Sequence, residues 1–508
     1  MAELERAPQG QAETGGPAGP VRPLRTGESP LGASIGQADS PGRRLKRSSR
    51  GADRLARPGE PRWLTDLRLR ALDRFDHLSW PTPQEEEWRR TDVTQIDFDA
   101  YDVLQGEGQS SIFAAAPAVP AAEGSGVPPG PRLKSGFAAR VCFEGGSCRQ
   151  LALRPELRSK GVRFGTLSAL SRGEDVGAQA LQAVQRALEE GFRGLDNRLQ
   201  AWHYSSLSHG VFLYVPPFVE IGELFVVELA EAGRNVVSAP HVAMILDRGA
   251  RAKVLVRTVG DGAADLPSEG ARRWPLLVNL GLDLEVGESA GLELYHLQDL
   301  PLSALTFSHA SARVGRDGRL VSFEAALGSG LLKSRLECSL DGPGAEALLH
   351  GVYLSRERQH LDIRTVQRHR AAHTSSRGFY KGAIKDRSRS IFQGLIEVAP
   401  AAAKTDAFLT DRNLILNDGA RADSIPSLRI DTNDVKCSHG STTGRLDETQ
   451  VFYLMTRGLS RGEAERMLIL GYFEELLGQT PERFADELRG LIGRRVENQF
   501  EGASDDRG

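Results

Sequence analysis

The stretch Glu288-Ser-Ala-Gly-Leu-Glu-Leu-Tyr-His-Leu297 joins a corner of small residues to a short β-like run. Runs of this kind, separated by Gly, Asp and Pro, follow one another over residues 210–434 without a long helical pattern between them. Small-residue corners return at residues 248–250, 343–345 and 418–420, and such corners allow a neighbouring coil to stack closely. A sandwich, a barrel and a stacked β-solenoid are all consistent with many short strands. The recurring corners favour the solenoid, although their spacing has no fixed period.

Helical patterns lie on both sides of this β region. Before it, apolar residues at helical spacing predict a helix over residues 63–75 and another over residues 174–199. After it, Asp447 with Gln450, and Ser460 with Glu463, are spaced as capping boxes and predict two helix starts. A third helix is expected after Thr480-Pro481, because proline is favoured at the first helical position.

These patterns divide the chain into four parts. We expect a disordered basic tail over residues 1–60, a helical and mixed domain over residues 61–205 with a linker at 106–133, a β-helix core over residues 206–438, and a helical domain over residues 439–508. The tail contains the basic run Arg43-Arg-Leu-Lys-Arg-Ser-Ser-Arg50, which suggests either a grip on RNA or a solvated tail. Its Gly-, Pro- and Ser-rich surroundings favour the solvated tail.

Composition narrows the class of protein. The chain has 508 residues and a net charge of −3, which gives no electrostatic reason to expect nucleic acid as the main partner. Its four cysteines are too few for a disulfide framework in a chain of this length, so we expect a reducing, cytoplasmic setting. No run approaches the roughly 18 apolar residues that cross a bilayer, and the N-terminus lacks the pattern of a secretory signal, so no membrane association is expected.

Cys437 and His439 are the candidate ligands of the chain. They lie two residues apart in Asp434-Val-Lys-Cys-Ser-His-Gly440, where the β region gives way to helices. On a strand, both side chains would point to the same face. A thiolate and an imidazole are suitable ligands for a metal ion or an iron–sulfur cluster. Two ligands do not close such a site, so other groups must complete it.

Other motifs in the sequence carry little chemistry. The phosphate-loop pattern is absent, so nucleotide hydrolysis by this chain is not expected. The pattern Gly-x-Ser-x-Gly at residues 287–291 precedes a strand rather than a helix, which indicates a β corner and not a nucleophile. His350, His360, His369 and His373 have spacings that match no helical metal motif, and we interpret them as structural.

The segment around Cys437 and His439 resembles the C-terminal signature of the SufB/SufD family of iron–sulfur cluster assembly proteins. The resemblance rests on the segments 434–440, Leu446-Asp-Glu448, Phe452-Tyr-Leu454, Arg457-Gly458 and Glu463-Ala464, and upstream on Tyr380-Lys-Gly382, 392–398 and Asn413-Leu414. It is strong over residues 370–475 and weaker over residues 205–370. Within the family the chain is most similar to SufD, because Cys437-Ser-His-Gly440 has the SufD form and residues 416–420 lack the cysteine found in SufB proteins.

The resemblance implies a fold, a function and partners. The implied fold is a right-handed parallel β-helix flanked by N- and C-terminal helical domains. The implied function is that of a scaffold subunit, non-catalytic alone, in a SufB–SufC–SufD complex on which an iron–sulfur cluster is assembled. His439, with Cys437 beside it, would lie at a cluster site shared transiently with a SufB-like subunit, and His439 would be the iron ligand. A flavin on the complex, and a homodimer formed without SufB, are both left open.

The resemblance also implies that a SufC-like ATPase docks on the C-terminal helices. The residues expected to leave apolar area for that partner are Phe452, Tyr453, Met467, Leu468, Tyr472 and Phe473. Considered alone, such helical stripes more often pack on the chain's own core. A competing hypothesis from another class is a β-solenoid enzyme acting on carbohydrate, which would need paired carboxylates across a groove. No such pair is identifiable from spacing.

Overall fold

The computed structural model describes residues 61–104, 137–171, 176–233, 235–260 and 274–497. The predicted tail with its basic run, and the predicted linker at 106–133, lie outside these residues. The described chain is mainly β: a solenoid of about eight turns with helices at both termini, as the sequence predicts. No described helix is long and apolar enough to span a membrane.

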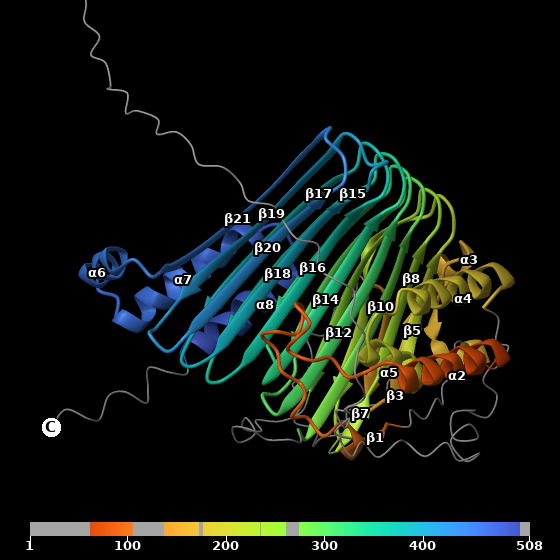
Figure 1. The fold of residues 1–508 in the computed structure, drawn as a ribbon, viewed down its shortest axis with the longest axis horizontal. Coiled ribbons are helices and arrows are strands. Elements are labelled where there is room, and N and C mark those ends of the chain that lie inside the picture. Colours follow the sequence, from red (N-terminus) through yellow and green to blue (C-terminus); the bar gives the residue numbers. More distant parts are fainter. Residues whose placement is uncertain (1–60, 105–136, 172–175, 234, 261–273, 498–508) are drawn as a thin grey trace, which may run out of the picture. The chain divides into compact units, whose positions relative to one another are not determined.

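Two large sheets form the walls of the solenoid (Figure 1). Sheet A has the order β20 (Arg421–Ile430), β18 (Arg389–Val398), β16 (His360–His369), β14 (Leu331–Leu340), β12 (Ala304–Val314), β10 (Leu276–Val286), β8 (Pro240–Leu246), β5 (His209–Val215) and β4 (Arg163–Thr166), with β1 (Asp102–Val103) and β7 (Val236–Ser238) attached beside β10. Sheet B has the order β21 (Val435–Arg445), β19 (Thr405–Ile415), β17 (Ser375–Ile384), β15 (Glu346–Ser355), β13 (Arg319–Ala326), β11 (Gly291–Asp299), β9 (Arg251–Gly260), β6 (Glu220–Glu231), β2 (Phe137–Glu144) and β3 (Ser147–Leu153). From β8 onward, successive strands alternate between the two sheets. Neighbours within a sheet are parallel except for β2–β3 and β4–β5.

The corners explain why small residues recur along the sequence. The amide of Gly249 donates to the carbonyl of Glu288 at 2.8 Å, and the amide of Ser289 donates to the carbonyl of Arg316 at 2.8 Å, so each corner stacks on the corner of the next coil. Gly249 has a φ of 66° and Ser289 a φ of 54°, a left-handed conformation that large or branched side chains rarely adopt. The corner pattern of the sequence therefore marks the stacking of a solenoid.

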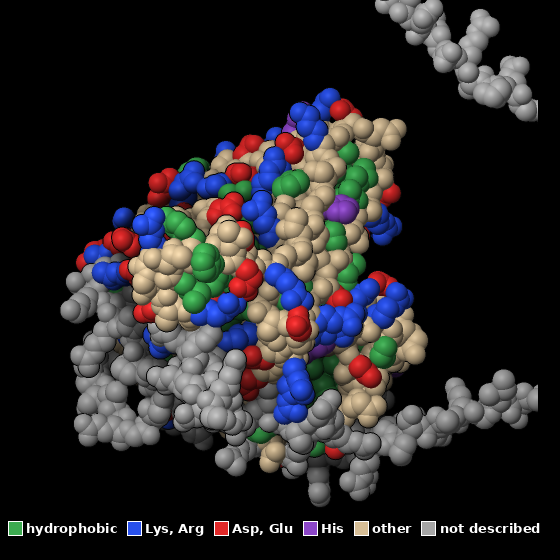
Figure 2. Space-filling view, turned by 90° about the vertical axis from the view of Figure 1, so that its left-hand side faces the viewer, with side chains coloured by type: hydrophobic (Ala, Val, Ile, Leu, Met, Phe, Trp, Pro, Cys, Tyr) green, Lys and Arg blue, Asp and Glu red, His purple; other side chains and the backbone are tan. Residues whose placement is uncertain are grey.

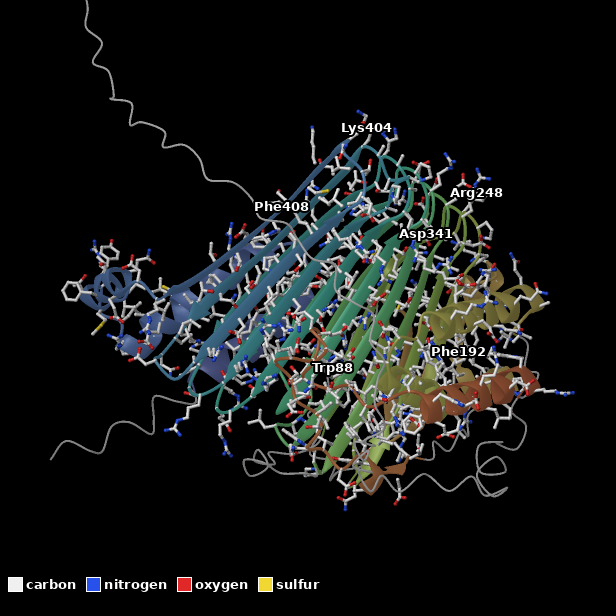
Figure 3. The ribbon with its side chains drawn as sticks, viewed as in Figure 1. Trp88, Phe192, Arg248, Asp341, Lys404 and Phe408 are labelled. Carbon is white, nitrogen blue, oxygen red and sulfur yellow. The ribbon has the colours of Figure 1, made fainter. Side chains whose placement is uncertain are left out.

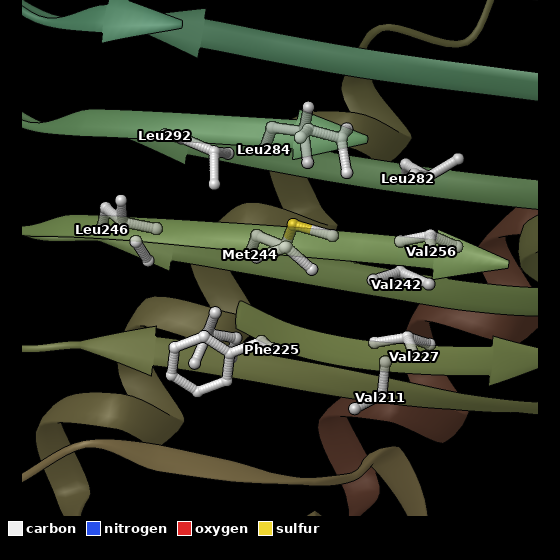
Figure 4. Close-up of a cluster of buried hydrophobic side chains, with 14 of the residues drawn as sticks. Val211, Phe225, Val227, Val242, Met244, Leu246, Val256, Leu282, Leu284 and Leu292 are labelled. Carbon is white, nitrogen blue, oxygen red and sulfur yellow. The ribbon is translucent and has the colours of Figure 1, made fainter. Parts of the chain in front are cut away.

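Apolar side chains from both sheets fill the interior. Figure 4 shows part of this core, in which side chains of sheet A and sheet B meet between the two walls. Residues on each strand alternate between the interior and the outer face, which is the period-two pattern of a strand buried on one side. Fully buried examples are Val227, Met244 and Leu284. This continuous core is the main stabilising feature of the solenoid.

Helices cover the outer faces of the two sheets at opposite ends of the chain. The outer face of sheet A packs against α2 (Arg62–His77), α4 (Ala178–Arg193) and α5 (Arg198–Ser206). The outer face of sheet B packs against α7 (Arg461–Leu477) and α8 (Glu482–Glu497), while α6 (Glu448–Thr456) projects beyond the last coil (Figure 1). Short helical segments α3 (Pro155–Ser159), η1 (Phe98–Ala100) and η2 (Leu167–Ser171) complete the fold.

Two sequence expectations differ in detail. The helix expected over residues 174–199 is two helices, because α4 ends at Arg193 and Asn197 caps α5 by accepting a hydrogen bond from the amide of Gln200. The last strand, β21, runs to Arg445, past the boundary expected at residue 438. The capping box of Ser460 and Glu463 is present as predicted, and Asp447 caps α6 by accepting from the amide of Thr449.

Candidate functional site

The last coil of the solenoid is made of β20 and β21. Each is the outermost strand of its sheet, so within the described chain each pairs with a neighbour on one side only. β21 pairs with β19 in a register that places Cys437 beside Ala407 and His439 beside Leu409. The other edge of β21 therefore presents unpaired backbone groups next to both candidate ligands.

Cys437 and His439 share the face of β21 that continues the interior of the solenoid. Their neighbours in the preceding coil, Ala407 and Leu409, are 1% and 0% exposed. Ser438 is aligned instead with Phe408, whose side chain is 41% exposed on the outer face (Figure 3). The alternation expected from the sequence is thus present. His439 is exposed although it faces inward, because β21 belongs to the last coil of the described chain and no further described coil covers it.

The interior of the last coil is an uncovered apolar surface. Leu428 and Ile430 of β20 are 38% and 37% exposed. Their neighbours one coil earlier, Ile396 and Val398, are 0% and 1% exposed. Side chains at matching strand positions are buried in one coil and exposed in the next. The core of the solenoid is therefore not covered by any described residues at this end. Figure 2 views the molecule from the side on which α6 and the last strands lie.

The electrostatic setting of Cys437 favours the neutral thiol. Partial burial raises the pKa of Cys437, the carboxylate of Asp406 raises it further, and a hydrogen bond involving the backbone of Ala407 lowers it. A thiol that binds a metal ion must lose its proton, so ligation by Cys437 would need a cation close by. The thiol is therefore not a preformed nucleophile.

The two candidate ligands do not make a complete metal site. Within the described residues no group of three or more His, Cys, Asp or Glu side chains is placed to hold a metal ion. Cys437 and His439 fit a partial site, because a soft sulfur and an imidazole share one face at an open end. The remaining ligands would have to come from outside the described residues.

The interior next to the last coil contains polar residues that the sequence reasoning missed. Asp411 lies on β19, beside Ser441 of the last coil and two positions from Leu409, and its side chain is 0% exposed. Burial raises the pKa of Asp411 to about 6. Tyr353 and Asn413 surround its carboxyl group. The signal in the sequence was that Asp411 and Asn413 are in phase with the buried Leu409, which places polar groups inside a strand-lined core.

The six residues expected to form a docking surface are distributed differently from the prediction. Phe452, Tyr453 and Met467 are 67%, 56% and 51% exposed. Leu468 and Tyr472 are half-buried, and the hydroxyl of Tyr472 donates to the carbonyl of Arg412 at 2.7 Å. Phe473 is fully buried against sheet B and α8, so it contributes no surface to a partner. The apolar surface available on these helices is centred on α6 and the start of α7.

The four histidines interpreted as structural belong to no group of three or more metal-ligating side chains among the described residues. His360 contacts the hydroxyl of Thr91 at 2.9 Å, and His369 lies 2.8 Å from the hydroxyls of both Thr374 and Ser376. Burial lowers the pKa of His350, His360 and His369 to about 4. His350, His360 and His369 are consequently neutral near pH 7.

Comparisons with known proteins bear on this site. The SufBD core domain of SUF-system FeS cluster assembly proteins matches residues 229–472, which include the last coil, α6 and most of α7. The chain is 27% identical over 363 residues to an iron–sulfur cluster assembly SufBD family protein of Mycobacterium tuberculosis, covering 68% of this chain and 87% of that protein. It is 25% identical over 442 residues to SufD of Bacillus subtilis, covering 86% and 95% of the two chains.

A third relative has higher identity over a shorter span. Over 220 residues the chain is 31% identical to SufD of Escherichia coli, covering 42% of this chain and 52% of that protein. All three relatives are named for iron–sulfur cluster assembly. None of these names favours the competing hypothesis of a carbohydrate-active enzyme.

Proposed function

Because the chain belongs to the SufBD family of iron–sulfur cluster assembly proteins, we propose that it is a SufD-like scaffold subunit of a SufB–SufC–SufD type complex. In this proposal the chain catalyses no reaction alone. It works in the cytoplasm, where it holds one side of the surface on which iron and sulfur are joined. The observation that carries the proposal is the open last coil, where Cys437 and His439 lie on an uncovered continuation of the core.

A SufB-like subunit is the proposed partner of the last coil. The free edges of β20 and β21 can accept further strands through backbone hydrogen bonds. Such pairing would also cover Leu428 and Ile430, whose burial would add about 25 cal/mol for each Å² of apolar area removed from water. The backbone edge and the apolar surface adjoin, so a single partner can satisfy both. A second copy of this chain could occupy the same edge when the SufB-like subunit is absent.

His439 is the proposed iron ligand at this interface, and Cys437 is its companion. In this role the chain supplies one or two ligands, and the partner supplies the rest, which agrees with the partial site described above. The cluster is then cargo of the complex rather than a resident group of this chain. The second ring nitrogen of His439 would be oriented by a group of the partner.

A SufC-like ATPase is the proposed partner of the exposed apolar residues of α6 and α7. Phe452, Tyr453 and Met467 form this surface, with Met455, which is 41% exposed, on the same helix as the first two. Large aromatic and methionine side chains are the types enriched in the centres of protein interfaces. α6 follows the C-terminal end of β21, whereas Cys437 and His439 lie near the start of that strand, so the two proposed partner sites are at different ends of β21.

The proposal is tested by co-purification and anaerobic cluster reconstitution with SufB-like and SufC-like partners. We expect the His439→Ala variant to bind both partners but to assemble the cluster at least about tenfold more slowly, because loss of a group that only orients a metal ligand already costs about 10–100-fold. Ser438→Ala is the matched control, because Ser438 is adjacent on the same strand but faces outward. Equal rates for His439→Ala and Ser438→Ala would remove the ligand role, and failure of the wild-type chain to retain either partner would remove the proposed complex.

A further inference from the structure

Three buried polar side chains form a closed triangle inside the solenoid, one coil beneath Cys437 and His439. The hydroxyl oxygen of Tyr353 lies 2.8 Å from Oδ1 of Asp411 and 2.7 Å from Oδ1 of Asn413. The amide nitrogen of Asn413 donates to Oδ2 of Asp411 at 2.7 Å. The side chains of Asp411, Tyr353 and Asn413 belong to residues that are 0%, 1% and 5% exposed, so bulk water does not reach them.

Counting hydrogens shows that this triangle is one hydrogen short when Asp411 is ionised. Three close contacts between oxygen or nitrogen atoms need three bridging hydrogens. The hydroxyl of Tyr353 supplies one. The side-chain amide of Asn413 makes two of the contacts, one through its nitrogen and one through its oxygen, and only the nitrogen carries hydrogens. Asn413 therefore supplies one bridging hydrogen whichever way the amide is turned. The third hydrogen can come only from Asp411.

The protonated form of Asp411 satisfies every contact. Its carboxylic acid donates to the hydroxyl oxygen of Tyr353, that hydroxyl donates to Asn413, and the amide of Asn413 donates back to Asp411. In the ionised form one contact of 2.7 Å or 2.8 Å would join two acceptors without a hydrogen between them. Buried acceptors that face each other in this way are strongly unfavourable.

The surroundings of Asp411 contain no charge that would stabilise its carboxylate. Among the described residues Asp411 forms no ion pair, whereas the buried Asp362 lies 2.8 Å from Nζ of Lys333, and the buried Asp283 lies 3.2 Å from Nε2 of His241. The groups that face Asp411 are neutral: Tyr353 of β15, Asn413 of its own strand, and the hydroxyl of Ser424 of β20. Tyr472 of α7 is the other titratable group close enough to interact with it.

We propose that Asp411 is held as the neutral carboxylic acid and forms a proton-binding site directly beneath the last coil. The proton keeps this part of the interior uncharged. Anionic sulfur, as sulfide or as a thiolate, can then reach the coil that carries Cys437 and His439 without meeting a buried negative charge. This functional consequence rests on the proposed function, whereas the bound proton does not.

Infrared spectroscopy of the full chain tests the proton itself. At roughly pH 6 ordinary carboxyl groups are ionised, so the carbonyl band of a protonated carboxylic acid reports buried groups. We expect Asp411→Asn to remove intensity from this band, because asparagine can replace every hydrogen bond of the neutral acid. Asp423→Asn is the control and should leave the band unchanged, because Arg389 and Arg421 hold the pKa of Asp423 below its usual range. Glu324→Gln identifies the share of a second buried acid, Glu324, whose pKa burial also raises.

The infrared result is decisive by itself. If the wild-type chain and the Asp411→Asn variant give the same band at that pH, Asp411 is ionised and the proposal is wrong. The result does not depend on partners, iron or sulfide, so it holds whether or not the chain assembles clusters.

The pH profile of cluster assembly with free sulfide tests the consequence. Ionisation of Asp411 would place a negative charge beneath the last coil, and at an effective dielectric constant near 20 this repulsion slows the approach of an anion by about tenfold or more. We expect the wild-type complex to lose this factor, relative to the Asp411→Asn complex, between about pH 5 and pH 7, as Asp411 loses its proton. Parallel profiles would overturn the role in admitting anionic sulfur. Absence of assembly by either complex would instead count against the proposed function.

Discussion

The most specific packing feature of the interior is a tyrosine ring that crosses a glycine, and replacing that glycine tests it. Gly382 of β17 lies between Tyr353 of β15 and Asn413 of β19 in the strand register. A β-carbon added at Gly382 would lie 2.0 Å from Cε2 of Tyr353 and 2.4 Å from its Cζ. The absence of a side chain at Gly382 is therefore what lets Tyr353 reach the triangle with Asp411.

We expect Gly382→Ala to destabilise the chain by about 2–5 kcal/mol. Overpacking of a tight interior costs about 1–3 kcal/mol. Displacing the hydroxyl of Tyr353 from two buried partners adds about 1 kcal/mol for each hydrogen bond. Alanine restricts the unfolded chain more than glycine does, which offsets about 0.4–1 kcal/mol of this destabilisation. Urea unfolding of the isolated chain, followed by circular dichroism, measures the difference.

Gly440→Ala is the matched control for this measurement. Gly440 also lies in a strand of sheet B, but nothing approaches within 4 Å of a β-carbon added there. We expect this variant to differ from the wild type by no more than about 0.5 kcal/mol. If the two glycine variants unfold at the same urea concentration, Tyr353 does not cross Gly382. A Tyr353→Leu background refines the result, because the cost of Gly382→Ala should fall when the clashing ring is absent.

Two further predictions concern buried charges. Arg257 lies 2.7 Å from Glu228 and 2.5 Å from Glu487, and all three side chains are largely buried. Arg257→Met leaves Glu487 without its cation, whereas Glu228 keeps Arg140, and the change should cost about 3–5 kcal/mol. Hydrogen exchange should show α8 loosening first, and unchanged protection of α8 would contradict this. Burial raises the folded-state pKa of Asp411 to about 6, above about 3.9 for an exposed aspartate, so its proton adds about 3 kcal/mol of stability below roughly pH 4 that is lost as the pH rises through roughly 6. The difference in unfolding free energy between the wild type and Asp411→Asn should therefore be pH-dependent, with the wild type losing about 3 kcal/mol relative to the asparagine variant as the pH rises from roughly 4 to above 6. A difference that stays constant over this range would refute the shift.

The sequence predicted the architecture because the corners and the strands are local features. The corner at residues 288–290 and the run after it can be recognised without knowing what packs against them, and the capping box of Ser460 forms within four residues. The break between α4 and α5 was missed because the apolar periodicity was followed through Gly194 and Asn197. Those two residues carry the usual signals of a helix end and a helix start.

The end of the solenoid and its polar interior could be predicted only in part. The shared face of Cys437 and His439 follows from strand periodicity, but the continuation of β21 to Arg445 does not, because Ser441-Thr-Thr-Gly444 has no apolar pattern and pairs through its backbone with β19. Phe473 was expected at a surface, yet the register of α7 against sheet B places it in the core. The triangle of Asp411 depends on residues about 60 positions apart, so no local pattern reveals it.

The two ends of the solenoid differ in a way that identifies the one built for a partner. At the end nearest the N-terminus, the antiparallel strands β3 and β4 border the sheets, and Leu157 of α3 and Val162 are buried at 6% and 0% exposure within the core. The outermost strand there, β3, exposes the polar residues Arg149 and Gln150. That end is closed by the chain itself, and polar edge residues oppose further pairing.

The opposite end has neither kind of protection. Its last coil exposes Leu428 and Ile430 from the face that is fully buried one coil earlier, and no described helix of the chain lies over this face. An uncapped core and two unpaired strand edges are costly in a monomer, because apolar area stays in water and the edges invite unspecific pairing. The chain closes one end and leaves open the end that carries Cys437 and His439. In the proposed complex, a partner that completes this coil would also complete the ligand set, which would couple assembly of the complex to formation of the cluster site.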